Sequence, residues 1–128
     1  MPTDGLMEAA ISGNAAHVRT ALADGADPNA RNGRGWTALM YAVIAHSDEV
    51  VAALIAAGAD VNQRAADGGT ALMRAALWGR TTAATLLLDN GADPDVMDAD
   101  GWTAVRIAAT QGHREIVRLL DRRQVSGG

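Results

Sequence analysis

Apolar residues recur along this chain with the spacing of helices. Leu72 and Ala76 lie four residues apart, and Val51, Leu54 and Ile55 follow the same kind of spacing. Side chains three or four residues apart share one face of a helix. The pattern therefore predicts helices that each bury a single apolar face.

Two short motifs repeat along the chain at a constant distance. One contains Thr-Ala followed by an apolar residue, the other is Gly-Ala-Asp, and the step between copies of either motif is 33 residues. Two independent markers in one register predict stacked copies of a single structural unit. The copies are Gly-Trp-Thr-Ala-Leu-Met at 35–40, Gly-Gly-Thr-Ala-Leu-Met at 68–73 and Gly-Trp-Thr-Ala-Val-Arg at 101–106, with Gly-Ala-Asp at 25–27, 58–60 and 91–93.

Each unit is predicted to contain a helix, a tight turn, a second helix and an extended hairpin loop. The threonine of the first motif stands where a helix N-cap is needed, because its hydroxyl can accept a hydrogen bond from a free backbone N–H. Glycines follow the helices, where a positive φ is required, and prolines then prevent the second helix from resuming. The positions are Thr37, Thr70 and Thr103 for the caps, Asp48, Thr81 and Arg114 for the second helices, Gly79 and Gly112 for the turns, and Gly58, Gly91, Pro28 and Pro94 for the ends.

These motifs resemble those of the ankyrin repeat family. The family pattern of Gly-x-Thr-Pro-Leu-His, Ala-Ala, Val-x-x-Leu-Leu and Gly-Ala-Asp-Val-Asn is visible along almost the whole chain. The resemblance implies an all-α fold with short β-hairpin fingers, in which four stacked helix-turn-helix units form a curved solenoid with a concave binding face. A single ankyrin repeat domain would span 1–125, with repeats at about 4–33, 34–66, 67–99 and 100–125, followed by a flexible tail at 126–128.

The chain departs from the family pattern at two positions of each unit. Alanine replaces the proline after the cap threonine, and the family's histidine is also replaced, which removes its hydrogen bond to the threonine. We expect a modest loss of stability without a change of fold. The replacements are Ala38, Ala71 and Ala104 for the proline, and Met40, Met73 and Arg106 for the histidine.

Both end units place polar residues where inner units are apolar. His17 is in register with Val50 and Asp121 with Leu88, while Asp4 takes the place of the cap threonine. Terminal repeats have one face without a neighbour and therefore need such polar residues. We expect the four units to form a complete protein.

Composition limits the possible function. The chain has 128 residues, no cysteine and a net charge of −4, which excludes disulfides and thiolate metal sites and argues against nucleic-acid binding. The amino terminus does not resemble a signal peptide, and the longest apolar run is too short to cross a membrane. We expect a soluble, cytoplasmic protein without membrane contact. Abundant Ala, Arg, Gly and Asp without Lys are typical of a GC-rich, bacterial genome.

Catalysis finds little support in the sequence. His46, Ser47 and Asp48 are the residue types of a catalytic triad, but sequence neighbours in a turn cannot adopt triad geometry. The plainer interpretation is that Ser47 or Asp48 caps the next helix. The chain is therefore expected not to be an enzyme.

Metal and cofactor binding are also not expected. His17 and His113 lack a second ligand at metal-binding spacing. The segment 93–101 superficially resembles a calcium loop, but Met97 stands at a ligand position and no glutamate closes the loop. A phosphate-binding loop ending in Gly-Lys-Ser/Thr is absent because the chain has no lysine.

With catalysis and metal binding not expected, the function is expected to lie in contacts made by the protein surface. In ankyrin proteins, partner contacts come from the finger tips and the ends of the first helices, and the resemblance implies the same here. Trp and Arg, both frequent at interface hot spots, are prominent among these positions. The candidate partner-binding residues are Arg31, Arg34, Trp36, Ile44, Arg64, Asp67, Leu77, Trp78, Asp100, Trp102 and Gln111.

The three tryptophans allow two interpretations. Trp36 and Trp102 either pack against the adjacent finger or contact a partner, and the two roles are compatible. Trp78 is predicted to contact a partner, because the family position at the end of a first helix faces the concave groove, beside Leu77.

Charge is unevenly distributed over the fingers. Arginines occupy the first two fingers and aspartates the third. Two interpretations are open. Either the charges form exposed salt bridges between fingers, such as Arg34 with Asp67, each worth only about 0–1 kcal/mol, or they orient a partner along the row of fingers. The residues are Arg31, Arg34 and Arg64, and Asp95, Asp98 and Asp100.

We therefore expect a non-catalytic protein–protein interaction module that binds an unidentified protein or peptide segment on its concave face as a monomer, without a cofactor. Two alternatives are a dedicated inhibitor or regulator of a single enzyme or toxin, and an engineered ankyrin scaffold. The absence of lysine and the many irregular positions count against a designed origin.

Overall fold

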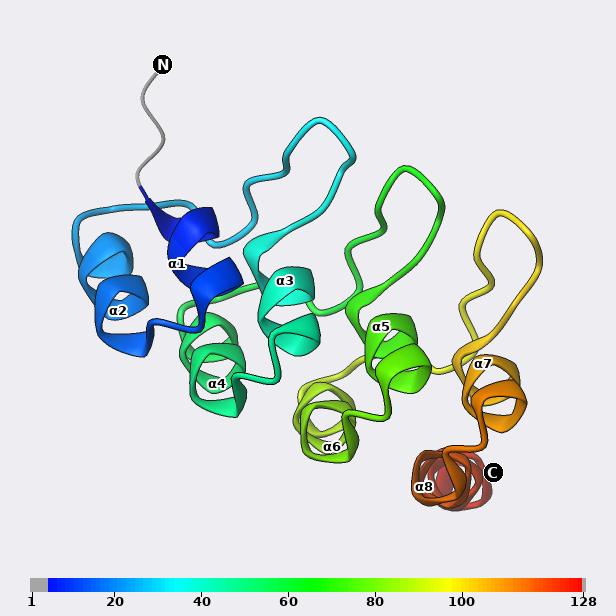
Figure 1. Ribbon diagram of the computed structural model, residues 1–128. Coiled ribbons are helices and arrows are strands. Elements are labelled where there is room, and N and C mark those ends of the chain that lie inside the picture. Colours follow the sequence, from blue (N-terminus) through cyan, green and yellow to red (C-terminus); the bar gives the residue numbers. More distant parts are fainter. Residues whose placement is uncertain (1–4, 128) are drawn as a thin grey trace.

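The computed structural model describes residues 5–127, and the side chains from Gly5 to Arg122. Within this part of the chain, eight helices form four pairs that stack side by side, and hairpin loops project between the pairs (Figure 1). The first helices of the pairs pack in one row and the second helices in another. The helices are α1 Leu6–Ser12, α2 Ala15–Ala23, α3 Ala38–Ile44, α4 Asp48–Ala56, α5 Ala71–Trp78, α6 Thr81–Asp89, α7 Ala104–Gln111 and α8 Arg114–Gly127.

The first helices of the last three pairs begin where the sequence predicts. Thr37, Thr70 and Thr103 are their N-caps, and each hydroxyl accepts a hydrogen bond from the backbone N–H three residues later, at 3.3 or 3.4 Å. Met40 and Met73, which replace the family's histidine, are buried in the core. The predicted caps are therefore confirmed, and apolar packing takes the place of the lost side-chain hydrogen bond.

The first pair begins differently. Gly5 is the N-cap of α1 and provides no side-chain hydrogen bond, and Asp4, predicted as the equivalent of the cap threonine, lies outside the described residues. A glycine at an N-cap costs little because the backbone groups stay accessible to water.

The second helices α4, α6 and α8 also begin where expected, but the predicted capping of α4 is wrong. Ser47 is its N-cap residue without a side-chain hydrogen bond, and Asp48 Oδ1 is buried without a hydrogen-bond partner. The physical reason is the direction of Ser47, whose Oγ lies against Gly13 of the preceding turn. Ser47 thus packs against the previous unit instead of capping its own helix with its side chain.

The core lies between the two rows of helices. Leu54, Leu87 and Leu120 occupy the same position of successive second helices, and all three are completely buried. Burying a leucine side chain contributes about 1.5–3 kcal/mol. Ala42 and Ala75 are also completely buried, and their small side chains let neighbouring helices approach closely. The periodic apolar pattern therefore becomes one continuous core.

The fingers are hairpin-shaped loops. Within the described residues no regular strand forms, and the first finger contains an isolated antiparallel bridge between Arg31 and Thr37. Backbone hydrogen bonds connect neighbouring fingers, from Ala66 N to Arg34 O at 2.9 Å and from Ala99 N to Asp67 O at 3.0 Å. The fingers therefore form one ridge beside the row of first helices (Figure 1).

Asparagines join the loops that follow the second helices. Asn62 Nδ2 donates to Gly91 O at 3.0 Å, and its Oδ1 accepts from Asp93 N at 2.7 Å. Asn29 makes the same pair of bonds, to Gly58 O at 3.3 Å and from Asp60 N at 2.6 Å. The first unit is thus fixed to the second, and the second to the third, at this edge as well.

The last helix is longer than the others. It continues to Gly127, so two residues of the segment expected as a tail, 126–128, are helical, and Gly128 lies outside the described residues. Between residues 5 and 127, no helix has the length and apolar composition needed to cross a lipid bilayer.

Candidate partner-binding surface

The eleven candidate residues lie in two neighbouring rows. The row on the fingers begins at Arg31, and the other row runs along the C-terminal ends of the first helices, from Ile44 in α3 to Gln111 in α7. The finger row contains Arg31, Arg34, Trp36, Arg64, Asp67, Asp100 and Trp102, and the helix row contains Ile44, Leu77, Trp78 and Gln111.

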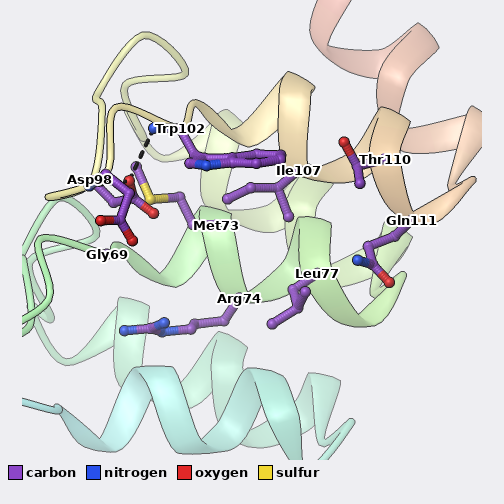
Figure 2. Close-up of a pocket in the computed structure, with 10 residues that line it drawn as sticks. Gly69, Met73, Arg74, Leu77, Asp98, Trp102, Ile107, Thr110 and Gln111 are labelled. Carbon is purple, nitrogen blue, oxygen red and sulfur yellow. Dashed lines mark hydrogen bonds between the residues drawn. The ribbon is translucent and has the colours of Figure 1, made fainter.

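A cavity of about 280 Å³ opens between these rows, at the junction of the third and fourth units. We call it the slot. Figure 2 shows Trp102 and Ile107 on one side of it and Arg74 and Leu77 on the other. Its lining is Gly69, Met73, Arg74, Leu77, Asp98, Asp100, Trp102, Ile107, Thr110 and Gln111.

The slot brings together only part of the predicted set. Leu77, Asp100, Trp102 and Gln111 line it, whereas the other candidates lie elsewhere on the ridge and helices. The candidate list missed six of the ten lining residues. One signal could have found two of them, because Arg74 and Ile107 are in register with Tyr41, beside Trp36. The missed residues are Gly69, Met73, Arg74, Asp98, Ile107 and Thr110.

Trp36 is packed into the fold. Its ring lies 4.8 Å from that of Tyr41, and the Arg74 guanidinium carbon lies 4.3 Å from its ring centroid. Aromatic pairs and cation–π contacts each contribute about 0.5–1.5 kcal/mol beyond burial. Trp36 is therefore only partly exposed, and the interpretation in which it stiffens the stack has direct structural support.

Trp102 is held by its own finger and by the helix that follows it. Asp98 Oδ1 accepts hydrogen bonds from the backbone N–H groups of Trp102 and Asp100, both at 2.9 Å. The guanidinium carbon of Arg106 lies 4.3 Å from the Trp102 ring centroid. The indole is thus fixed as one wall of the slot, and it is partly exposed.

The end of α5 presents two large apolar side chains to solvent. Trp78 is 51% exposed and Leu77 is 39% exposed. Leu77 lines the slot, but Trp78 does not. Gln111, which is in register with Trp78, lines the slot from α7.

Two of the candidate arginines have a structural role. Arg31 Nη2 donates to Arg64 O at 3.1 Å, and Arg64 Nη2 donates to Met97 O at 2.7 Å. Each guanidinium thus bonds to the same backbone position of the next finger. Both residues remain exposed, so partner contact by these arginines stays a prediction.

The predicted ion pair between Arg34 and Asp67 is wrong. Asp67 instead pairs with Arg74, whose Nη2 lies 2.9 Å from its Oδ1 and 3.2 Å from its Oδ2. Arg34 meets the next finger through its backbone, because its carbonyl oxygen accepts from Ala66 N. The hydrogen bond from Arg74 lowers the pKa of Asp67, against an opposing effect of partial burial.

The His46-Ser47-Asp48 segment forms the turn between α3 and α4. His46 has a φ of 60°, in the left-handed region. Ser47 points toward Gly13, and Asp48 begins α4. In the part of the chain that the structure describes, no group of three or more His, Cys, Asp or Glu residues is placed to hold a metal ion.

Comparison with known families gives one result. A family model described as ankyrin repeats in three copies matches residues 6–98 and 64–124, which together span most of the chain. No curated protein matches the chain significantly.

Proposed function

We propose that this chain, which belongs to the ankyrin repeat family, is a non-catalytic module that binds a protein or peptide segment on the face formed by the finger tips and first helices. Ankyrin repeats are generally protein–protein interaction modules. The proposal adds which face makes the contact, and the candidate residues described above are its contact points.

One observation carries the choice of face. Among the described residues, four large apolar side chains are exposed, and three of them stand at the C-terminal ends of first helices. Ile11 in α1 and Leu77 in α5 occupy the same repeat position and are 52% and 39% exposed, while Trp78 follows directly. Clustered exposed apolar side chains beside polar residues are typical of protein-binding surfaces. The fourth such side chain is Met97.

The rigid stack suits this role. The fingers are joined by backbone hydrogen bonds, and the contact residues of the helix row stand on short helices with a buried apolar face. A preorganised surface loses little conformational entropy on binding. The binding energy would therefore come from apolar anchors such as Trp78, and charged finger residues would set orientation and association rate.

A peptide-display selection with matched variants tests the face. Binders selected from a random library are measured against the wild type, Trp78→Asp and Ala52→Asp. Ala52 is exposed on α4, in the row of second helices. We expect Trp78→Asp to weaken most binders at least about tenfold, the loss of about 1.4 kcal/mol, and Ala52→Asp to leave them unchanged.

Two other outcomes would count against the proposal. Binders that respond to Ala52→Asp and not to Trp78→Asp would place the binding surface on the second helices. Binders that ignore both variants would exclude the groove around α5. Because Trp36 is packed under Arg74, a variant that also removes Trp36 would confuse lost binding with lost stability, and it is therefore left out.

A further inference from the structure

The slot results from an irregularity in the repeat. Position 36 of the second unit and position 102 of the fourth are tryptophans, whereas the third unit has Gly69 in the same register. Gly69 lines the slot. The third unit thus lacks the indole that its neighbours have. The Arg74 guanidinium reaches into the position of that missing side chain, and the slot stays open between Arg74 and Trp102.

The walls of this space suit a flat ring. Arg74 stands on one side with its side chain only 12% exposed, and Trp102 and Ile107 stand on the other (Figure 2). Met73, which is buried, and Leu77 add apolar surface. A planar guanidinium opposite an indole is an arrangement that binds aromatic rings by cation–π contact and stacking.

The rim of the slot carries net negative charge, because two carboxylates stand there against one nearby cation, Arg106, whose guanidinium lies over the Trp102 ring. Arg74 is neutralised by its ion pair with Asp67. Asp98 and Asp100 line the slot, and no cation of the described residues forms an ion pair with either carboxylate. An acidic or phosphorylated segment would be repelled there, whereas a basic side chain would complement these carboxylates.

We infer that the slot binds one aromatic side chain of a partner segment, with a neighbouring arginine or lysine of that segment against Asp98 and Asp100. The inference rests on the proposed function and specifies the partner's chemistry. The aromatic ring occupies the open space between Arg74 and Trp102. The basic residue then sets the direction of the segment along the ridge.

Gly69→Trp is the test variant, because it fills the slot from within the chain. A Cβ at Gly69 would meet the Arg74 guanidinium at 2.8 and 3.0 Å and Asp67 Oδ1 at 3.0 Å. These are the ends of flexible side chains that can move, and Gly69 is not among the glycines with a positive φ. Gly33→Trp is the matched control, since Gly33 also lacks a positive φ and nothing lies within 4 Å of its Cβ position.

The probe is the dipeptide acetyl-Trp-Arg-amide, titrated into labelled protein and followed by NMR. We expect saturable shifts of the Trp102 indole N–H and the Ile107 and Leu77 methyl groups, with a dissociation constant on the order of 1 mM. Gly33→Trp should bind equally, and Gly69→Trp at least about tenfold more weakly. Acetyl-Ala-Arg-amide and acetyl-Trp-Glu-amide should each bind several-fold more weakly, on the order of fivefold.

The outcomes separate this inference from the proposed function. Absence of saturable shifts, or equal binding by Gly69→Trp, overturns the aromatic site. Equal binding of the Glu dipeptide overturns the role of Asp98 and Asp100. If display-selected peptides depend on Trp78 and are insensitive to Gly69→Trp, the concave face stands and the slot assignment fails. If they depend on neither residue, both fail.

Discussion

The turn between α5 and α6 shows how closely neighbouring units pack, and a single methyl group can test it. Gly79 has a φ of 71°, and a Cβ built on it would lie 2.7 Å from His113 Cε1 of the next unit. The His113 ring is itself hydrogen bonded through Nε2 to Leu77 O at 3.2 Å. Gly79→Ala therefore strains the backbone and displaces a side chain that joins the third and fourth units.

The expected loss has two parts. Placing an alanine in the left-handed region costs about 1–2 kcal/mol, and losing the His113 hydrogen bond costs about 0.5–1.5 kcal/mol. Gly79→Ala should therefore lower the free energy of unfolding by about 1.5–3.5 kcal/mol. Gly112→Ala is the matched control, because Gly112 ends α7 in the same kind of turn with a φ of 79° and nothing within 4 Å. Gly112→Ala should lower the free energy of unfolding only by the cost of the left-handed backbone, about 1–2 kcal/mol.

Urea unfolding followed by circular dichroism measures both variants. Because end units of a solenoid can unfold separately, Gly91→Ala is a second control within the third unit, with a φ of 95° and nothing within 4 Å. The His113→Ala background should abolish the extra loss of Gly79→Ala, since the ring that the methyl group would meet is gone. Equal losses for Gly79→Ala and both controls would refute the reasoning that His113 packs against this turn.

Two further substitutions test contacts between and within units. The hydrogen bond from Arg74 lowers the pKa of Asp67, so the pair stabilises the fold above the ordinary carboxyl pKa of about 3.9 and is lost as pH falls through the lowered value. Because Asp67 is largely exposed, Asp67→Asn should cost only about 0–1 kcal/mol at neutral pH, and acid unfolding curves should converge with the wild type once the pH falls below the lowered pKa of Asp67. Asn62→Ala removes the hydrogen bonds to Gly91 O and from Asp93 N, so the free energy of unfolding should fall by about 1–3 kcal/mol; an unchanged urea midpoint would show that water replaces both bonds.

The helices could be predicted from the sequence because their signals are local. The hydroxyl of Thr37 or Thr70 reaches a backbone N–H only three residues away, so the residue type and its position suffice. Glycines such as Gly58 and Gly91 end helices for the same local reason, and both have positive φ values. Repetition at 33 residues then turns local predictions into a stacked architecture.

Contacts between long side chains could not be predicted in this way. The sequence places Arg34 and Asp67 in register on neighbouring fingers, which suggests an ion pair, but the backbone of Arg34 makes the contact instead. Asp67 pairs with Arg74, seven residues later in its own unit. Arg74 can reach Asp67 because Gly69 has no side chain to block its path. The ion-pair partner of Asp67 thus depends on the absence of a side chain at position 69, which no sequence motif indicates.

The same guanidinium connects stability with the candidate site. Arg74 extends across the space beside Gly69 and lies over Trp36 of the preceding unit, so it ties the second and third units together while forming one wall of the slot. A substitution of Arg74 would therefore weaken the stack and alter the slot at once, and its effect on binding would have no single cause. A larger residue at Gly69 fills the slot and leaves Arg74 in the chain, but it pushes the guanidinium aside and so weakens its pair with Asp67. The free energy of unfolding of Gly69→Trp is therefore measured beside its affinity for the dipeptide, so that lost stability and lost recognition are told apart.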